Sequence, residues 1–136
     1  MPESPSPPKS IPSEKLARDI SRLALSKKAE DIHVLDVRQI TTITDYFIVC
    51  SGSTDVHVKA IHDSILEGLE AEIKPWHVEG IDALRWVLMD YVDVVVHVFQ
   101  PEVRDYYQLE RLWADADMEI LQDEPTETPK AGNAGR

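Results

Sequence analysis

The run from Tyr46 to Ser51 constrains the fold more than any other part of the chain, because nearly every residue in it is apolar. A short run of this kind is typical of a strand in the centre of a sheet, where neighbouring elements cover its side chains. Helical patterns flank it on both sides in the sequence. We therefore expect an α/β protein in which helices cover a sheet.

Two amphipathic helices are predicted around that strand. Ser13 is the expected N-cap of the first, and Ser53 or Thr54 of the second, because short hydroxyl side chains satisfy the free N–H groups of a helix start. The apolar residues of each helix recur at spacings of three and four, which places them on one face. They are Leu16, Ile20, Leu23 and Ala24 in the first helix, and Val58, Ile61, Ile65 and Leu69 in the second.

Further strands are predicted at 32–37, 76–79, 84–90 and 94–99, with a tight hairpin connection at 91–93. A final helix is expected from Pro101 to Ile120. Its inward residues would be Tyr106, Leu109, Trp113, Ala116 and Ile120, and its outward residues Arg104, Gln108, Arg111 and Asp115. The order α-β-β-α-β-β-β-α predicts one mixed sheet covered by helices.

The length of 136 residues suits one domain. Residues 1–12 contain five prolines and three serines, and residues 122–136 are polar, so both are expected to be flexible tails. The predicted domain is 13–121. Of the formal net charge of -11, the tails account for about one negative charge. A domain this acidic repels phosphate backbones and attracts basic proteins, so we expect a protein partner and no direct nucleic-acid binding.

No stretch approaches the roughly 18 apolar residues that a membrane helix needs, and the first ten residues lack the pattern of a secretion signal. A cytoplasmic protein is expected. Cys50 is the single cysteine, so no internal disulfide is expected. Its place in the apolar run 46–51 predicts a buried, inert thiol.

The strongest local hint of enzyme chemistry is the turn Ser51-Gly52-Ser53, which separates a strand from a helix. Nucleotidyltransferases bind phosphate at such a turn and hold their metal with two carboxylates on a following strand. Here no Asp-x-Asp strand follows, and Asp55 and Asp63 fall on the helix. Ordinary helix capping is the favoured interpretation, and a nucleotide-binding or nucleotidyltransferase-like enzyme is the alternative.

Metal and cofactor sites are not expected. Asp115 and Asp117 fall in the predicted last helix, where residues two apart point away from each other. His57 and His62 are five apart, which is off the i, i+4 spacing of paired ligands. His97 lies in the apolar run 94–99, where a structural sheet histidine is favoured over a catalytic base.

An aromatic and acidic group in the second half of the chain is the candidate binding surface. Strand alternation places Trp86 and Asp90 on one face and Val87 and Met89 on the other. If Val87 and Met89 face the core, Trp86 is exposed beside a carboxylate, as in a hot spot for a basic partner. Burial of Trp86 under a helix is the equally weighted alternative.

Three segments resemble the ribosomal silencing factor family, also known as RsfS or Iojap. The first is Asp45-Tyr46-Phe47-Ile48-Val49-Cys50-Ser51-Gly52-Ser53, followed by a helix with Val58-Lys59-Ala60-Ile61. The second runs from Trp86 through Asp90, Tyr91 and Asp93 to His97 and Phe99. The third is Arg104-Asp105-Tyr106-Tyr107-Gln108-Leu109-Glu110-Arg111-Leu112-Trp113. The similarity spans residues 14–120.

The resemblance implies a nucleotidyltransferase-like fold without catalytic carboxylates, and no enzyme activity or cofactor. It implies a homodimer when free, and binding to large-subunit ribosomal protein fourteen, which blocks joining of the two subunits and represses translation during starvation or stationary phase. The expected partner-binding residues are Trp86, Asp90, Tyr91, Asp93, Arg104, Tyr107 and Glu110. One departure is Val92, where the family has glycine. Because β-branched residues resist positive φ, we expect a different turn conformation there.

Overall fold

The computed structural model describes residues 11–121, which form a six-stranded sheet in the order β3-β4-β5-β2-β1-β6. The elements are α1 (Ser13–Ser26), β1 (Glu30–Asp36), β2 (Tyr46–Ser51), α2 (Asp55–Leu69), β3 (His77–Glu79), β4 (Trp86–Asp90), β5 (Val94–Phe99), α3 (Pro101–Tyr107), α4 (Leu109–Leu112) and β6 (Asp117–Leu121). The expected tails lie outside the described residues, except for Ile11 and Pro12. Ile11 packs against the core.

The predicted mixed sheet is confirmed. β2 and β5 lie side by side and parallel at its centre, and the other neighbouring strands pair antiparallel. Every residue of β2 and β5 is buried. The uninterrupted apolar run 46–51 therefore does mark a central strand, as its sequence predicts. The implied nucleotidyltransferase likeness stays a prediction.

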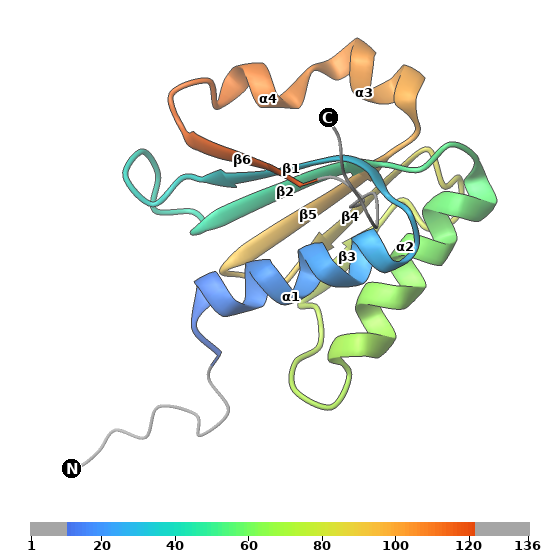
Figure 1. Cartoon of the computed structure of the whole chain (residues 1–136), viewed down its shortest axis with the longest axis horizontal. Helices are drawn as coiled ribbons and strands as arrows, with labels where there is room; N and C mark the ends of the chain where they lie inside the picture. Colours follow the sequence, from blue (N-terminus) through green and yellow to red (C-terminus); the bar gives the residue numbers. More distant parts are fainter. Residues whose placement is uncertain (1–10, 122–136) are drawn as a thin grey trace, which may run out of the picture.

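Helices cover both faces of the sheet (Figure 1). α1 and α2 lie on one face, over the larger hydrophobic cluster, which includes Ile20, Ile48, Ile65 and Met89. α3 and α4 lie on the other face, over a smaller cluster built around Leu35, Phe47, Val95 and Phe99. Cys50 is fully buried in the larger cluster, and burial raises the pKa of its thiol to about 12, so the expectation of an inert thiol is supported.

The two predicted N-caps have different outcomes. Thr54 caps α2 as expected, since its hydroxyl accepts the backbone N–H of His57 at 3.1 Å. The prediction for Ser13 is wrong: Ser13 is the first helical residue, and the residue before it, Pro12, provides no side-chain hydrogen bond. The Pro12 carbonyl accepts the N–H of Leu16 instead.

The predicted last helix, from Pro101 to Ile120, is wrong beyond its first half. Gln108 has left-handed backbone angles, φ 48° and ψ 53°, and separates α3 from the short α4. Residues 117–121 form strand β6, which pairs with β1. A five-residue run with apolar residues at 118, 120 and 121 fits both helical and strand periods. Pairing decides between them, because β6 satisfies the outer backbone groups of β1.

The turn between β4 and β5 places a β-branched residue in an unfavourable region of backbone space. Val92 adopts a positive φ of 74°, which β-branched side chains resist, and the expectation that this turn differs from the family's glycine turn stays a prediction. The N–H of Asp93 donates to the carbonyl of Tyr91 at 2.9 Å, which makes Val92 the centre of a γ-turn. The carboxylate of Asp90 accepts the N–H of Val92 at 2.8 Å. These bonds hold a β-branched residue in a conformation that costs it energy.

Candidate binding surface

Trp86 begins β4 on the face of the sheet that carries α3 and α4. The neighbouring residues Val87 and Met89 are fully buried on the opposite face, as the alternation predicts. Trp86 is nevertheless half-buried and not freely exposed, because α3 lies over it. The ring centroids of Phe99 and Tyr107 each lie 4.8 Å from that of Trp86. The structure therefore favours the alternative in which a helix covers the tryptophan, although part of its surface stays accessible.

His97 fixes the orientation of the Trp86 indole through a hydrogen bond. Nε1 of Trp86 donates a hydrogen bond to Nδ1 of His97, with 3.0 Å between the nitrogens. Burial lowers the pKa of His97 to about 4, so the imidazole is neutral near pH 7 and Nδ1 is free to accept. His97 is thus a structural sheet histidine that positions an aromatic side chain.

Two tyrosines of α3 extend the aromatic group to the surface. Tyr106 is 80% exposed, Tyr107 is 52% exposed, and their rings meet edge to face at 5.0 Å. A hollow of about 390 Å³ lies beside them. It is lined by Arg85, Trp86, Glu102, Val103, Tyr106 and Tyr107. We call these six residues the aromatic surface.

The prediction that Tyr106 faces inward is therefore wrong. Tyr106 and Tyr107 are adjacent in a helix, so they point about 100° apart, and a narrow apolar contact accommodates only one of them. In the structure Tyr107 packs on Trp86 and Tyr106 faces solvent. Two consecutive tyrosines were the available sign that one aromatic ring would be exposed.

Arg104 was expected to face outward, and this prediction is also wrong, because the residue is only 8% exposed. Its Nη1 donates to the hydroxyl of Ser51 at 2.9 Å, and its Nη2 donates to Oε2 of Glu110 at 2.5 Å. Nδ1 of His33 lies 2.5 Å from the same carboxylate oxygen. These contacts connect the segment around Gln108 to the middle of β1 and the end of β2.

The charge on Glu110 depends on this arrangement. Burial by itself would raise the pKa of its carboxyl, but the hydrogen bonds and charge of Arg104, together with a smaller contribution from His33, outweigh burial and hold the pKa below its ordinary value. Glu110 is thus ionised and paired at neutral pH. Arg104 and Glu110 act as a brace for α3 and α4 and offer little surface to a partner.

The remaining predicted residues lie at the far end of β4, roughly 13 Å from Trp86 at about 3.3 Å per residue. Tyr91 is buried in the larger cluster, its hydroxyl has no hydrogen-bond partner within residues 11–121, and burial raises its pKa to about 12. Asp90 holds the turn, and Asp93 is exposed. The seven predicted residues therefore fall into three groups. Trp86 and Tyr107 belong to the aromatic surface, Arg104 and Glu110 form the brace, and Asp90, Tyr91 and Asp93 lie at the turn between β4 and β5.

The Ser51-Gly52-Ser53 turn uses most of its N–H groups within the chain. The N–H of Gly52 donates to the Phe99 carbonyl at 2.9 Å, and that of Ser53 donates to Nδ1 of His57 at 2.8 Å. The hydroxyl of Ser51 accepts from Arg104. A phosphate bound at this turn would have to displace these bonds, so the geometry favours the capping interpretation.

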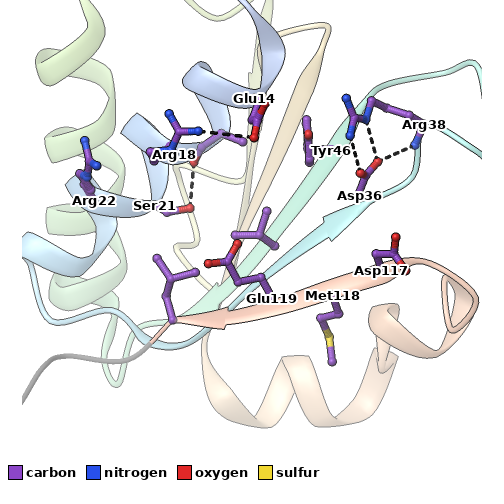
Figure 2. A pocket seen from close by; sticks show the side chains of 13 residues that line it. Glu14, Arg18, Ser21, Arg22, Asp36, Arg38, Tyr46, Asp117, Met118 and Glu119 are labelled. Atoms are coloured by element: carbon purple, nitrogen blue, oxygen red, sulfur yellow. Dashed lines mark hydrogen bonds and ion pairs between the residues drawn. The ribbon is translucent and has the colours of Figure 1, made fainter.

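A second hollow, of about 540 Å³, lies between α1 and the strands β1 and β6 (Figure 2). Arg18 and Arg22 come from α1, and Asp117 and Glu119 come from β6. The sequence prediction missed this groove, because it placed residues 117–121 in a helix.

Within residues 11–121, no three His, Cys, Asp or Glu side chains gather in a way that could hold a metal ion. In the same part of the chain, none of the helices has the length and apolar character needed to cross a membrane.

The fold and the surface define a small α/β domain that presents aromatic and acidic groups. The family model described as "Ribosomal silencing factor during starvation" matches residues 10–135. The chain belongs to this family, the RsfS or Iojap proteins.

Individual relatives agree with the family model. The chain is 46% identical over 96 residues to ribosomal silencing factor RsfS of Bacillus subtilis, which covers 70% of this chain and 81% of that protein. A Mus musculus protein named for mitochondrial assembly of the ribosomal large subunit is 34% identical over 95 residues, which is 67% of this chain and 42% of that protein. A crystal structure from Chromobacterium violaceum superimposes with a TM-score of 0.74 at 35% identity, covering 76% of this chain and 88% of that one.

Proposed function

We propose that this chain silences ribosomes. It binds large-subunit ribosomal protein fourteen in the cytoplasm and, by its bulk, keeps the small subunit from joining, which represses translation during starvation or stationary phase. The observation that carries the proposal is the aromatic surface, in which Trp86 is held by His97 and flanked by two accessible tyrosines. Family membership and the large-subunit name of the mouse relative support the choice of partner.

The physical properties of this surface suit a protein partner. Aromatic side chains that are already ordered lose little conformational entropy on binding, and tryptophan and tyrosine dominate the energetics of many interfaces. The net charge of -11 speeds association with a basic protein and opposes binding to exposed RNA. Steric blocking requires no bond-making residue, so the proposal includes neither enzyme activity nor a cofactor.

The three groups of predicted residues take different roles in this proposal. Trp86 and Tyr107 contact the partner directly, and Asp90 and Asp93 supply negative charge at the far end of β4. Arg104 and Glu110 act through the placement of α3, and Tyr91 supports the turn from within the core. The free protein is proposed to be a homodimer.

Purified ribosomal subunits test the binding step. The wild-type protein is mixed with isolated large subunits and separated on a sucrose gradient at two salt concentrations. We expect it to move with the large subunit and to bind more weakly at high salt, since salt screens the charge attraction. Recovery of the protein only at the top of the gradient at both salt concentrations would refute the proposal.

A variant pair locates the contact. Tyr107→Ala removes a half-exposed ring, and we expect binding to the large subunit to weaken at least about tenfold. Val56→Ala is the matched control, because Val56 is 75% exposed on α2, which covers the opposite face of the sheet. Equal binding by the two variants would show that the aromatic surface is not the contact.

A further inference from the structure

β6 is an edge strand whose outer side is unpaired. It pairs with β1 along its inner side, and no other described strand lies beyond it. Among residues 11–121, no other strand pairs with its outer backbone N–H and C=O groups, which makes it a template for another extended segment. Four of its five residues are exposed.

The two faces of β6 differ in chemistry. Asp117 and Glu119 point to the α1 side, where Figure 2 shows them at the groove, while Met118 points to the opposite side. Neither carboxylate forms a hydrogen bond or ion pair with another side chain of residues 11–121. On the α4 side, Met118 is 49% exposed and Ile120 is 52% exposed. An acidic row and an apolar row thus alternate along one open edge.

From this alternation we infer that β6 binds an extended segment of another protein in which basic and aliphatic residues alternate. Added beside β6, such a segment would place Lys or Arg next to Asp117 and Glu119. Its aliphatic residues would fall on the other face, against Met118 and Ile120. Opposite charges on neighbouring strands stabilise a pair, and the added backbone satisfies the open ladder.

The chain's own tails do not fit this site. Residues 1–12 contain five prolines, and residues 122–136 contain prolines at 125 and 129 and no aliphatic residue larger than alanine. Proline cannot donate a ladder hydrogen bond, and alanine offers little apolar surface to Met118 and Ile120.

A second copy of the chain is also a poor occupant. Two β6 strands paired about a two-fold axis would carry the acids of both copies on the same face, within reach of one another. Like charges on paired strands are destabilising. The same acids that favour a basic segment therefore oppose self-pairing, which is a common way to protect an edge strand.

Two synthetic peptides of equal charge test the inference on the full-length protein, without ribosomes. The first is Lys-Val-Lys-Val-Lys-Val-Lys. The second, Lys-Pro-Lys-Pro-Lys-Pro-Lys, keeps the lysines but lacks alternate N–H donors and aliphatic strand residues. We expect the first to shift the NMR signals of amides 117–121 saturably, and the second to bind at least about tenfold more weakly. Equal binding of the two, or shifts centred on Asp90 and Asp93, would overturn the inference, because only general charge attraction would remain.

A charge reversal provides the second arm. The double variant Asp117→Lys and Glu119→Lys should lose the preference for the lysine peptide and gain one for Glu-Val-Glu-Val-Glu-Val-Glu. Both positions are exposed, and thermal unfolding checks that the variant is folded. An unchanged peptide preference in the folded variant would contradict the inference. Concentration-dependent shifts of the β6 amide signals in the protein alone would also contradict it, because they would mean that a second copy occupies the edge. Because no ribosome is present, the result is separate from the outcome for the proposed function.

Discussion

The indole N–H of Trp86 is bonded to Nδ1 of a histidine, His97, that lies in the centre of the sheet. The bond requires His97 to be unprotonated at Nδ1, and burial keeps it so by lowering the pKa to about 4. The presentation of the aromatic surface is therefore coupled to the protonation of a core residue.

This coupling predicts a pH dependence of stability. His97 has a pKa of about 4 in the fold and an ordinary value of 6.5, so the unfolded chain binds more protons between these values. The stabilisation is fully present above pH 6.5 and is lost as the pH falls toward 4. We expect the free energy of unfolding in urea to fall by about 2 kcal/mol between pH 7 and pH 5 from this residue.

The variant His97→Gln isolates that contribution. Glutamine retains an acceptor for the Trp86 N–H but does not titrate, so the fall in stability between pH 7 and pH 5 should shrink by about the same 2 kcal/mol. An identical pH dependence in the variant and the wild type would show that His97 does not carry the effect.

The Arg104–Glu110 pair predicts a loss of stability when one partner is removed. Arg104→Ala leaves the partly buried carboxylate of Glu110 without its main partner, and we expect a cost of about 2–4 kcal/mol in urea unfolding. Arg111→Ala is the control, since Arg111 is exposed and hydrogen-bonds Gln108, and it should change stability by less than about 0.5 kcal/mol. Similar small effects of both variants would show that the Arg104–Glu110 pair does not stabilise the placement of α3 and α4.

Replacing Val92 with glycine should stabilise the protein. Val92→Gly relieves a β-branched residue at φ 74°, and because the side chain is more than half exposed little packing is lost. We expect a gain of about 1 kcal/mol in the free energy of unfolding. The same exchange in a helix, Val56→Gly, should instead cost up to about 0.5 kcal/mol. A loss of stability in Val92→Gly would mean that the turn is not strained.

Gly52 lies so close to Val58 that a single added methyl group should disrupt the packing. A Cβ at this position would lie 2.9 Å from both Cγ2 and the backbone nitrogen of Val58, where α2 begins. We expect Gly52→Ala to lower the free energy of unfolding by about 1–3 kcal/mol, because the backbone must shift. Ser53→Ala, the adjacent control, removes one exposed hydroxyl and should cost less than about 0.5 kcal/mol.

The parts of the fold that could be predicted from the sequence are those in which burial and local pattern agree. Strands 46–51 and 94–99 were predicted with the bounds that the structure has, because continuous apolar character marks the centre of a sheet. The resemblance to the family was likewise confirmed by the family model. Residues 117–121 could not be assigned in the same way, because short apolar spacings fit either period.

The burial of Arg104 and the covering of Trp86 depend on tertiary contacts that local sequence patterns do not reveal. Arg104 has the spacing of an outward-facing helix residue, but it is buried by pairs with Ser51 and Glu110, which are distant in sequence or lie beyond a break. The left-handed Gln108 that makes this pairing possible carries no strong local signal. Trp86 shows the same limit, since strand alternation predicts its face but not the helix that covers it.

Subunit joining in the presence of the protein is the most direct test of ribosome silencing. Isolated small and large subunits are mixed at joining magnesium concentrations with wild type, Tyr107→Ala or Val56→Ala, and the joined ribosome is quantified on a sucrose gradient. We expect wild type and Val56→Ala to reduce the joined peak. Tyr107→Ala, once thermal unfolding has shown that it is folded, should leave the peak largely intact. An undiminished joined peak with saturating wild-type protein would mean that the chain does not block subunit joining.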